Sequence, residues 1–180
     1  MIVLLYSLIE PKISHCIFYQ AGSVGHLPGG RAWEEDMLGK MKALVRENNL
    51  CVLATVSGGT PHCSLMAYAT DDGCREIYMV THRDTIKYRN LVDNPCVSLL
   101  IDTREEHTGV KRPEAKAMTV DGKYERIEDA DQRERALTRL LERHPHLRDF
   151  MEHPEAEILR IRIGSFLLLD GITDAHFEKL

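Results

Sequence analysis

The run from Leu50 to Asp102 constrains the fold more than any other part of the chain, because it alternates short apolar segments with turn residues. Four segments are rich in apolar and β-branched residues: 51–56, 62–70, 77–81 and 97–101. Ser57-Gly58-Gly59-Thr60 is a hairpin loop between the first two, and Asp71-Asp72-Gly73 closes a second hairpin. Four strands within about fifty residues predict a closed or nearly closed barrel.

Segments with the apolar spacing of an α-helix lie on both sides of this strand-rich run. Apolar residues recur at helical spacing from about 34 to 47, and Asp129 can cap a second helix whose apolar face includes Ala136 and Leu140. Two later segments read as further strands: 116–126 and 157–169. We therefore expect a mainly β fold with flanking helices.

The length of the chain fits a single compact domain. A hydrophobic content of 43% is enough for one sizeable core, and 180 residues are too few for two full-sized domains. We predict an irregular N-terminal extension at 1–33, the folded domain at 34–172 and a C-terminal tail at 173–180.

Composition excludes some partners. A net charge of −5 gives no general attraction to nucleic acid or to anionic membranes, and the apolar start, Met1–Ile9, is too short to span a bilayer. The five cysteines form an odd set without the spacing of a zinc site or a redox dithiol. We expect free thiols, a cytoplasmic location, and neither nucleic acid nor membrane as a partner.

The segment Thr81-His82-Arg83-Asp84-Thr85-Ile86-Lys87 opens a short helix directly after a strand. Hydroxyl, guanidinium and ammonium donors then meet free N–H groups at the start of the helix, which is the chemistry that binds an anion. A phosphate-bearing cofactor would fit there. The competing interpretation is that Lys87 is a solvated residue on an exposed helix face.

Alternation along the second strand puts His62, Ser64, Met66 and Tyr68 on one face, and this face is polar enough to meet a ligand. Ser64 is equally an ordinary strand serine, and Met66 is equally a core residue. No metal site is expected, because prolines interrupt the spacing of the C-terminal histidines. No sequence motif of a protein nucleophile is present, so no catalytic side chain is predicted.

The spacing of several short motifs resembles the FMN-binding split-barrel family related to pyridoxamine 5′-phosphate oxidase, from about 35 to 170. The motifs are Leu53-Ala54-Thr55, Gly59-Thr60-Pro61, Thr81, Thr85-x-Lys87, Asn90-Leu91 and Asn94-Pro95-x-Val97-Ser98. The resemblance implies a six-stranded antiparallel split β-barrel with flanking helices, built as a homodimer that binds FMN at the subunit interface.

The resemblance also implies roles for individual residues. Ser64 and Met66 match positions that lie along the flavin, and Thr81 matches the end of the third strand. The positions that match the phosphate-binding set are Arg83, Thr85 and Lys87. The tryptophan-and-arginine segment with which pyridoxamine phosphate oxidase binds its vitamin substrate has no counterpart in 166–180, so vitamin B6 oxidation is not expected.

These observations predict a flavin-dependent oxidoreductase that acts on a small organic substrate, with the flavin carrying the redox chemistry. One alternative is a non-catalytic module that binds a flavin, a deazaflavin or haem on the same barrel; haem would need an axial ligand such as a histidine. A further alternative, a scaffold that has lost its cofactor site, is disfavoured because Thr81, Thr85 and Lys87 occur together.

Overall fold

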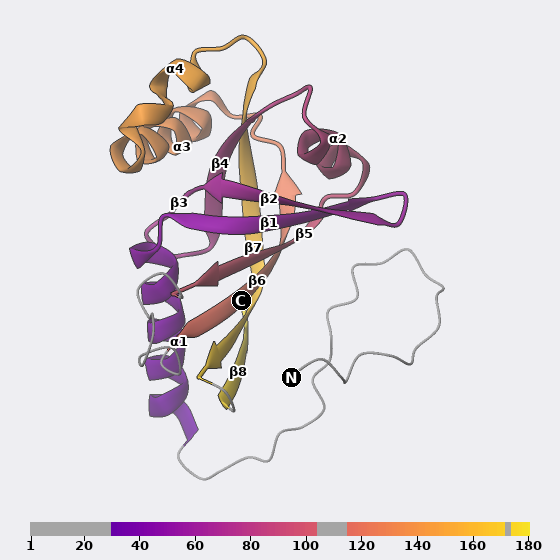
Figure 1. The fold of residues 1–180 in the computed structure, drawn as a ribbon. Helices are drawn as coiled ribbons and strands as arrows, with labels where there is room; N and C mark the ends of the chain where they lie inside the picture. Colours follow the sequence, from indigo (N-terminus) through magenta and orange to yellow (C-terminus); the bar gives the residue numbers. More distant parts are fainter. Residues whose placement is uncertain (1–29, 104–114, 172–173) are drawn as a thin grey trace.

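The computed structural model describes residues 30–103, 115–171 and 174–180 (Figure 1). Most of the predicted N-terminal extension, 1–33, lies outside these residues. The helices are α1 (Gly30–Glu47), α2 (Ile86–Asp93), α3 (Ala130–Arg143) and α4 (Arg148–Met151), with a short 3-10 turn at Pro145–Leu147. The strands are β1 (Leu50–Ser57), β2 (Thr60–Ala67), β3 (Ala69–Thr70), β4 (Glu76–His82), β5 (Cys96–Asp102), β6 (Lys116–Glu125), β7 (Ala156–Asp170) and β8 (Asp174–Lys179).

The described strands form one antiparallel sheet in the order β2-β1-β5-β6-β7-β4-β3. Strand β7 pairs with three other strands. Along one edge its first half pairs with β4 and its second half pairs with β8, and along the other edge it pairs with β6. The sheet curls around a core, and the helices flank it (Figure 1). The predicted mainly β split-barrel fold with flanking helices is confirmed.

The turn between β1 and β2 follows directly from its two glycines. Gly58 and Gly59 have φ angles of 56° and 79°, in the left-handed region where a residue without a Cβ is favoured. The turn puts Ser57 opposite Thr60, so the two strands stay in register over their full length.

The interior of the sheet packs against α1. Met41 and Val45 of this helix are fully buried with Leu53, Ile77 and other inward-facing strand residues. The hydroxyl of Tyr68 donates to the carbonyl of Val45 at 2.8 Å, which joins α1 to the short segment between β2 and β3. The second strand predicted at 62–70 is therefore two strands, separated at this buried tyrosine.

On its outer side, β4 is covered by α3. A second buried cluster contains Tyr78, Ala136, Leu140 and Ile158, contributed by β4, α3 and β7. Asp129 caps α3 by accepting from the backbone N–H of Gln132 at 2.6 Å, as the sequence predicted. Since both faces of β4 are covered, nearly every residue of this strand is buried.

Two expectations need correction, and a third is confirmed in part. The short helix begins at Ile86 and not at Thr81, because Thr81 and His82 are the last two residues of β4 and Thr85 is the N-cap. The segment assigned to a C-terminal tail contains β8, which pairs with β7. Cys51, Cys63 and Cys74 are free, which bears out the free-thiol prediction for these three residues.

No helix among the described residues is long and apolar enough to cross a membrane. The cytoplasmic location stays a prediction. The described residues hold no group of three or more histidine, cysteine or carboxylate side chains arranged for a metal ion. The buried His144, one of the histidines considered for such a site, instead shares a 2.8 Å hydrogen bond with the carbonyl of Tyr68.

Candidate functional site

The structure brings two of the predicted cofactor-binding hydroxyls together where β4 leads into α2. The Oγ1 atoms of Thr81 and Thr85 lie 3.1 Å apart. Thr81 is almost fully buried, and Thr85 donates to the carbonyl of His82 at 2.8 Å while accepting from the backbone N–H of Tyr88. Of the first N–H groups of α2, the Thr85 side chain accepts that of Tyr88. The backbone N–H groups of the residues before Tyr88 have no acceptor within the helix, as at the start of any α-helix.

Lys87 lies in the first turn of α2 and is half-buried. Burial lowers the pKa of its ammonium group. Among the described residues no carboxylate or other side chain pairs with this ammonium group. A charge that is partly withdrawn from water is unfavourable unless a group of opposite charge lies beside it. An anion bound beside the open N–H groups would supply that partner, so Lys87 fits a phosphate.

Arg83 pairs with a carboxylate of the protein and so differs from Lys87. Its Nε and Nη2 atoms both lie 2.9 Å from one carboxylate oxygen of Glu157 on β7, and Glu157 is only 8% exposed. The hydrogen bond to Glu157 and its charge raise the pKa of Arg83. Moving the guanidinium onto a ligand would leave a buried carboxylate without its partner, which is unfavourable. Arg83 is therefore held against β7, and its predicted phosphate role stays a prediction.

Two contacts fix α2 on β1. The buried Asn90 donates through Nδ2 to Thr55 Oγ1 at 3.1 Å, and Ser57 donates to a carboxylate oxygen of Asp93 at 2.5 Å. In the sequence, Thr55 and Asn90 were parts of two motifs, and neither residue was assigned a role. A buried hydroxyl inside an otherwise apolar strand was the available signal.

Ser64 and Met66 both face the barrel interior from β2. Met66 is buried opposite Cys51, and the half-buried Ser64 lies opposite Leu53. Among the described residues, neither side chain makes a hydrogen bond to Thr81 or Thr85. Met66 is part of the core, so its predicted flavin contact stays a prediction, as does that of Ser64.

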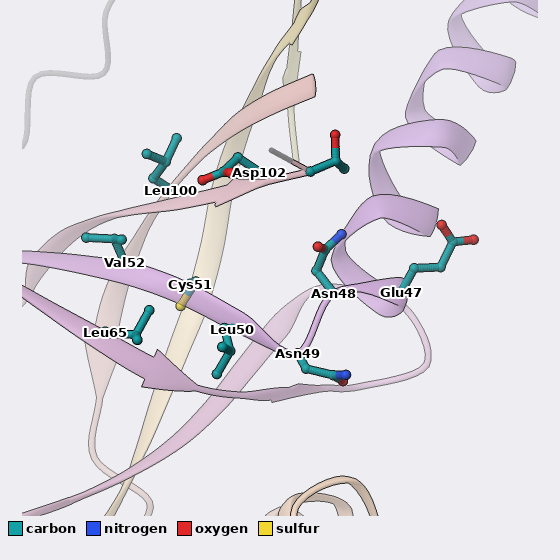
Figure 2. Close-up of a pocket in the computed structure, with 10 residues that line it drawn as sticks. Glu47, Asn48, Asn49, Leu50, Cys51, Val52, Leu65, Leu100 and Asp102 are labelled. Atoms are coloured by element: carbon teal, nitrogen blue, oxygen red, sulfur yellow. The ribbon is translucent and has the colours of Figure 1, made fainter. Parts of the chain in front are cut away.

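A pocket of about 290 Å³ lies at the opposite end of β1 (Figure 2). The ladder between β1 and β5 ends at Val52 and Leu100, although both strands continue beyond that pair. Apolar side chains of three strands line one part, and polar residues from the end of α1 and of β5 line the other: Glu47, Asn48, Asn49, Leu50, Cys51, Val52, Leu65, Leu100, Asp102 and Thr103. None of the predicted cofactor residues lines it.

Solved structures of low sequence identity share the fold. The chain is similar to a haem-binding protein from Mycobacterium smegmatis (18% identity, TM-score 0.67, 77% of this chain and 57% of that chain). It is also similar to HutZ, the haem storage protein of Vibrio cholerae (20%, 0.61, 74% and 93%), and to a FAD-binding protein from Mesorhizobium loti (21%, 0.59, 72% and 91%). This chain thus spans little more than half of the Mycobacterium protein.

The sequence itself matches no curated protein. A family model described as pyridoxamine 5′-phosphate oxidase matches residues 37–169, which include β1 to β6 and all of β7 except its last residue. The matched segment also includes the Thr81–Thr85 pair and Lys87. The chain therefore belongs to the pyridoxamine 5′-phosphate oxidase family.

Proposed function

We propose that this chain binds FMN where β4 meets α2 and acts as a flavin-dependent oxidoreductase on a small organic substrate. The observation that carries the proposal is Lys87, a half-buried ammonium group that has no anionic partner among the described residues and lies beside open helix N–H groups. Membership of the family adds to this support.

In the proposed complex, Lys87 and the start of α2 bind the phosphate, and the Thr81–Thr85 hydroxyl pair closes the same end of the site. Ser64 and Met66 would lie along the flavin from β2. Arg83 holds the connection between β4 and α2 through Glu157. The bound flavin would supply the electron or hydride transfer, so the protein needs only to bind, orient and shield it.

We further propose a homodimer that forms through the outer face of the sheet. Cross-strand neighbours form one row over six strands: Leu65, Val52, Leu100, Thr119, Leu167 and Phe177. Leu65 is 70% exposed and Phe177 is 42% exposed. Apart from Thr119 this row is apolar, and its exposed members are Leu65, Leu100 and Phe177. Exposed apolar side chains gathered on one face are typical of a protein interface, and a second copy of the chain presents the same row.

A second candidate is a haem-binding module without catalytic activity. Two structures that share the fold are named as haem-binding or haem storage proteins. The ammonium group of Lys87 would pair with a haem propionate as well as with a phosphate. His62, half-buried on the interior face of β2, is a candidate axial ligand. A module that holds a flavin or a deazaflavin for storage or sensing would use the same residues.

The absorption spectrum of the purified protein, followed by titration with FMN and with haem, distinguishes these candidates. Flavin bands with released FMN support the proposal, and a Soret band supports the haem module. A protein that binds neither contradicts both. Reoxidation of the reduced flavin by an added small substrate would separate an enzyme from a storage module.

Lys87→Ala tests the phosphate assignment. Losing one charge-assisted hydrogen bond should weaken FMN binding by about 1.5–3 kcal/mol, or roughly ten- to a hundred-fold in Kd. Lys40→Ala is the matched control, because Lys40 is an exposed lysine of α1 that pairs with Asp36 at 2.7 Å. A folded Lys87→Ala variant with unchanged affinity would rule out Lys87 as the phosphate ligand.

A further inference from the structure

The last residue of β4, His82, joins the candidate site to the helical segment on the outside of the sheet. Its ring stacks on Phe150 of α4 with centroids 4.0 Å apart and planes 9° apart. The ring of His153 also stacks with the His82 ring, with centroids 4.6 Å apart and planes inclined by 21°. The Nε2 atom of His82 is buried and has no hydrogen-bond partner among the described residues. The ring is therefore held by stacking and not by a polar contact through Nε2.

The main chain of the same residue holds the N-cap of α2. The carbonyl of His82 accepts from the backbone N–H of Thr85 at 3.2 Å and from the Thr85 hydroxyl at 2.8 Å. These two bonds orient the hydroxyl that lies 3.1 Å from Thr81 Oγ1. A displacement of the His82 backbone would move the Thr85 hydroxyl with it.

The segment between α4 and β7 attaches to this connection a second time. The backbone N–H of Arg83 donates to the carbonyl of Glu155 at 3.0 Å, and the N–H of Ala156 donates to the carbonyl of His153 at 2.9 Å. The segment thus contacts both the side chain of His82 and the main chain of the next residue. It limits how far the connection between β4 and α2 can move.

We propose that His82 is a positioning residue for the cofactor site: its stacked ring fixes its carbonyl, and the carbonyl fixes the Thr85 hydroxyl. The proposal rests on the proposed function, because it concerns the site where FMN would bind. His82 itself is not proposed to touch the cofactor. Alternation along β4 puts its side chain on the opposite face from Thr81, toward α4.

The test measures FMN affinity of the full chain by flavin fluorescence. Removing an aromatic stack in His82→Ala should weaken binding roughly two- to ten-fold. His82→Phe keeps a flat ring that can stack with Phe150 and His153 and should restore the affinity to within about two-fold of the unmodified chain. Phe150→Ala, which removes the partner ring from α4, should weaken binding as His82→Ala does.

His146→Ala is the matched control. His146 is an exposed histidine of the turn before α4, and its described ring contact is an edge-on one with His144 at 5.8 Å. This variant should bind FMN as the unmodified chain does. If folded His82→Ala keeps full affinity, or if His82→Phe is as weak as His82→Ala, the stack does not position the site and the proposal is wrong.

Hydrogen exchange gives a readout that does not depend on FMN. The amide protons of Thr85 and Tyr88 are bonded to the His82 carbonyl and to the Thr85 hydroxyl. Their exchange should be faster in His82→Ala and return to the original rate in His82→Phe. If the unmodified chain does not bind FMN, the proposed function fails while this result still supports the positioning role. Unchanged exchange in His82→Ala would overturn the positioning role in either case.

Discussion

The two sides of the sheet differ in how their outer faces are covered. Where β4 meets β7, Tyr78 and Ile158 are 6% and 4% exposed because α3 lies over them (Figure 1). On β2 and β5, the outward-facing Leu65 and Leu100 are 70% and 36% exposed. We call these the covered side and the open side. Both carry core-like side chains, but among the described residues only the covered side has a helix that buries them.

Polar contacts keep α3 in its place over the covered side. Arg139 makes a two-pronged ion pair with Asp72 at 2.9 and 2.8 Å. Arg143 donates to the side chain of Asn49 at 2.7 Å and to the carbonyl of Asn48 at 2.5 Å, at the turn between α1 and β1. The covered side is thus closed by residues distant in sequence, whereas no described helix closes the open side in this way. This difference is the basis for proposing the dimer face.

The largest expected effect comes from matched leucine truncations on the two sides. Leu159 is fully buried in β7, so Leu159→Ala should lower the free energy of unfolding by about 2–5 kcal/mol. Leu65→Ala removes the same atoms from an exposed position and should change the stability of the monomer by less than about 0.5 kcal/mol. Urea unfolding at low protein concentration measures both.

Equal losses in the two variants would contradict the contrast between the sides. A loss in Leu65→Ala that grows with protein concentration would instead sharpen it, because the truncation would then act on the dimer and not on the folded monomer.

A charge on the open side should disrupt the proposed dimer. Leu65→Asp places a carboxylate in the exposed apolar row, and burying it without a partner should weaken association by on the order of 3 kcal/mol, roughly a hundred-fold in Kd. Sedimentation over a range of concentrations gives the dimer dissociation constant of each variant.

The control introduces the same acid on the covered side. Arg135 is an exposed residue of α3, so Arg135→Asp adds a carboxylate to a surface that already faces water. It should leave the dimer constant unchanged. A monomeric unmodified chain, or equal dimer constants for Leu65→Asp and the unmodified chain, would remove the open side as the interface.

Local patterns were sufficient to predict most strands of the covered and open sides. The Gly58-Gly59 turn, the cap at Asp129 and the apolar alternation of β7 are each encoded within a few neighbouring residues. Strand β8 was missed because its sequence, Asp174-Ala175-His176-Phe177-Glu178-Lys179, is mostly polar. Such a segment forms a strand because it pairs with β7, and this pairing cannot be read from its own composition.

The candidate site was harder to predict than the fold for the same reason. The sequence placed the opening of the short helix at Thr81, whereas Thr81 lies in β4 and the helix begins at Ile86. In the structure a turn separates Thr81 from the N-cap Thr85, and this turn brings the two hydroxyls to 3.1 Å. The ion pair of Arg83 with Glu157 joins residues 74 positions apart, and no local pattern indicates it.

The smallest predicted effect compares two cysteines on adjacent strands. Cys51 of β1 faces the interior, and Cys63 of β2 is exposed. Burial raises the pKa of the Cys51 thiol from 9.0 to about 12. The folded protein therefore keeps this thiol neutral at a pH where the unfolded chain ionises it. Stability is unaffected below pH 9 and falls as the pH rises from 9 toward 12.

At pH 10 this linkage should lower the free energy of unfolding by about 1.4 kcal/mol relative to pH 8. Burial also raises the pKa values of Tyr68 and Tyr78, so the contribution of Cys51 is the difference between the unmodified chain and Cys51→Ala in urea unfolding at both pH values. Cys63→Ala, which removes an exposed thiol from the adjacent strand, is the matched control for the loss of a thiol. If Cys51→Ala loses as much stability between pH 8 and pH 10 as the unmodified chain does, the Cys51 thiol is accessible to water, and the interior face of β1 is less well covered than that of β7.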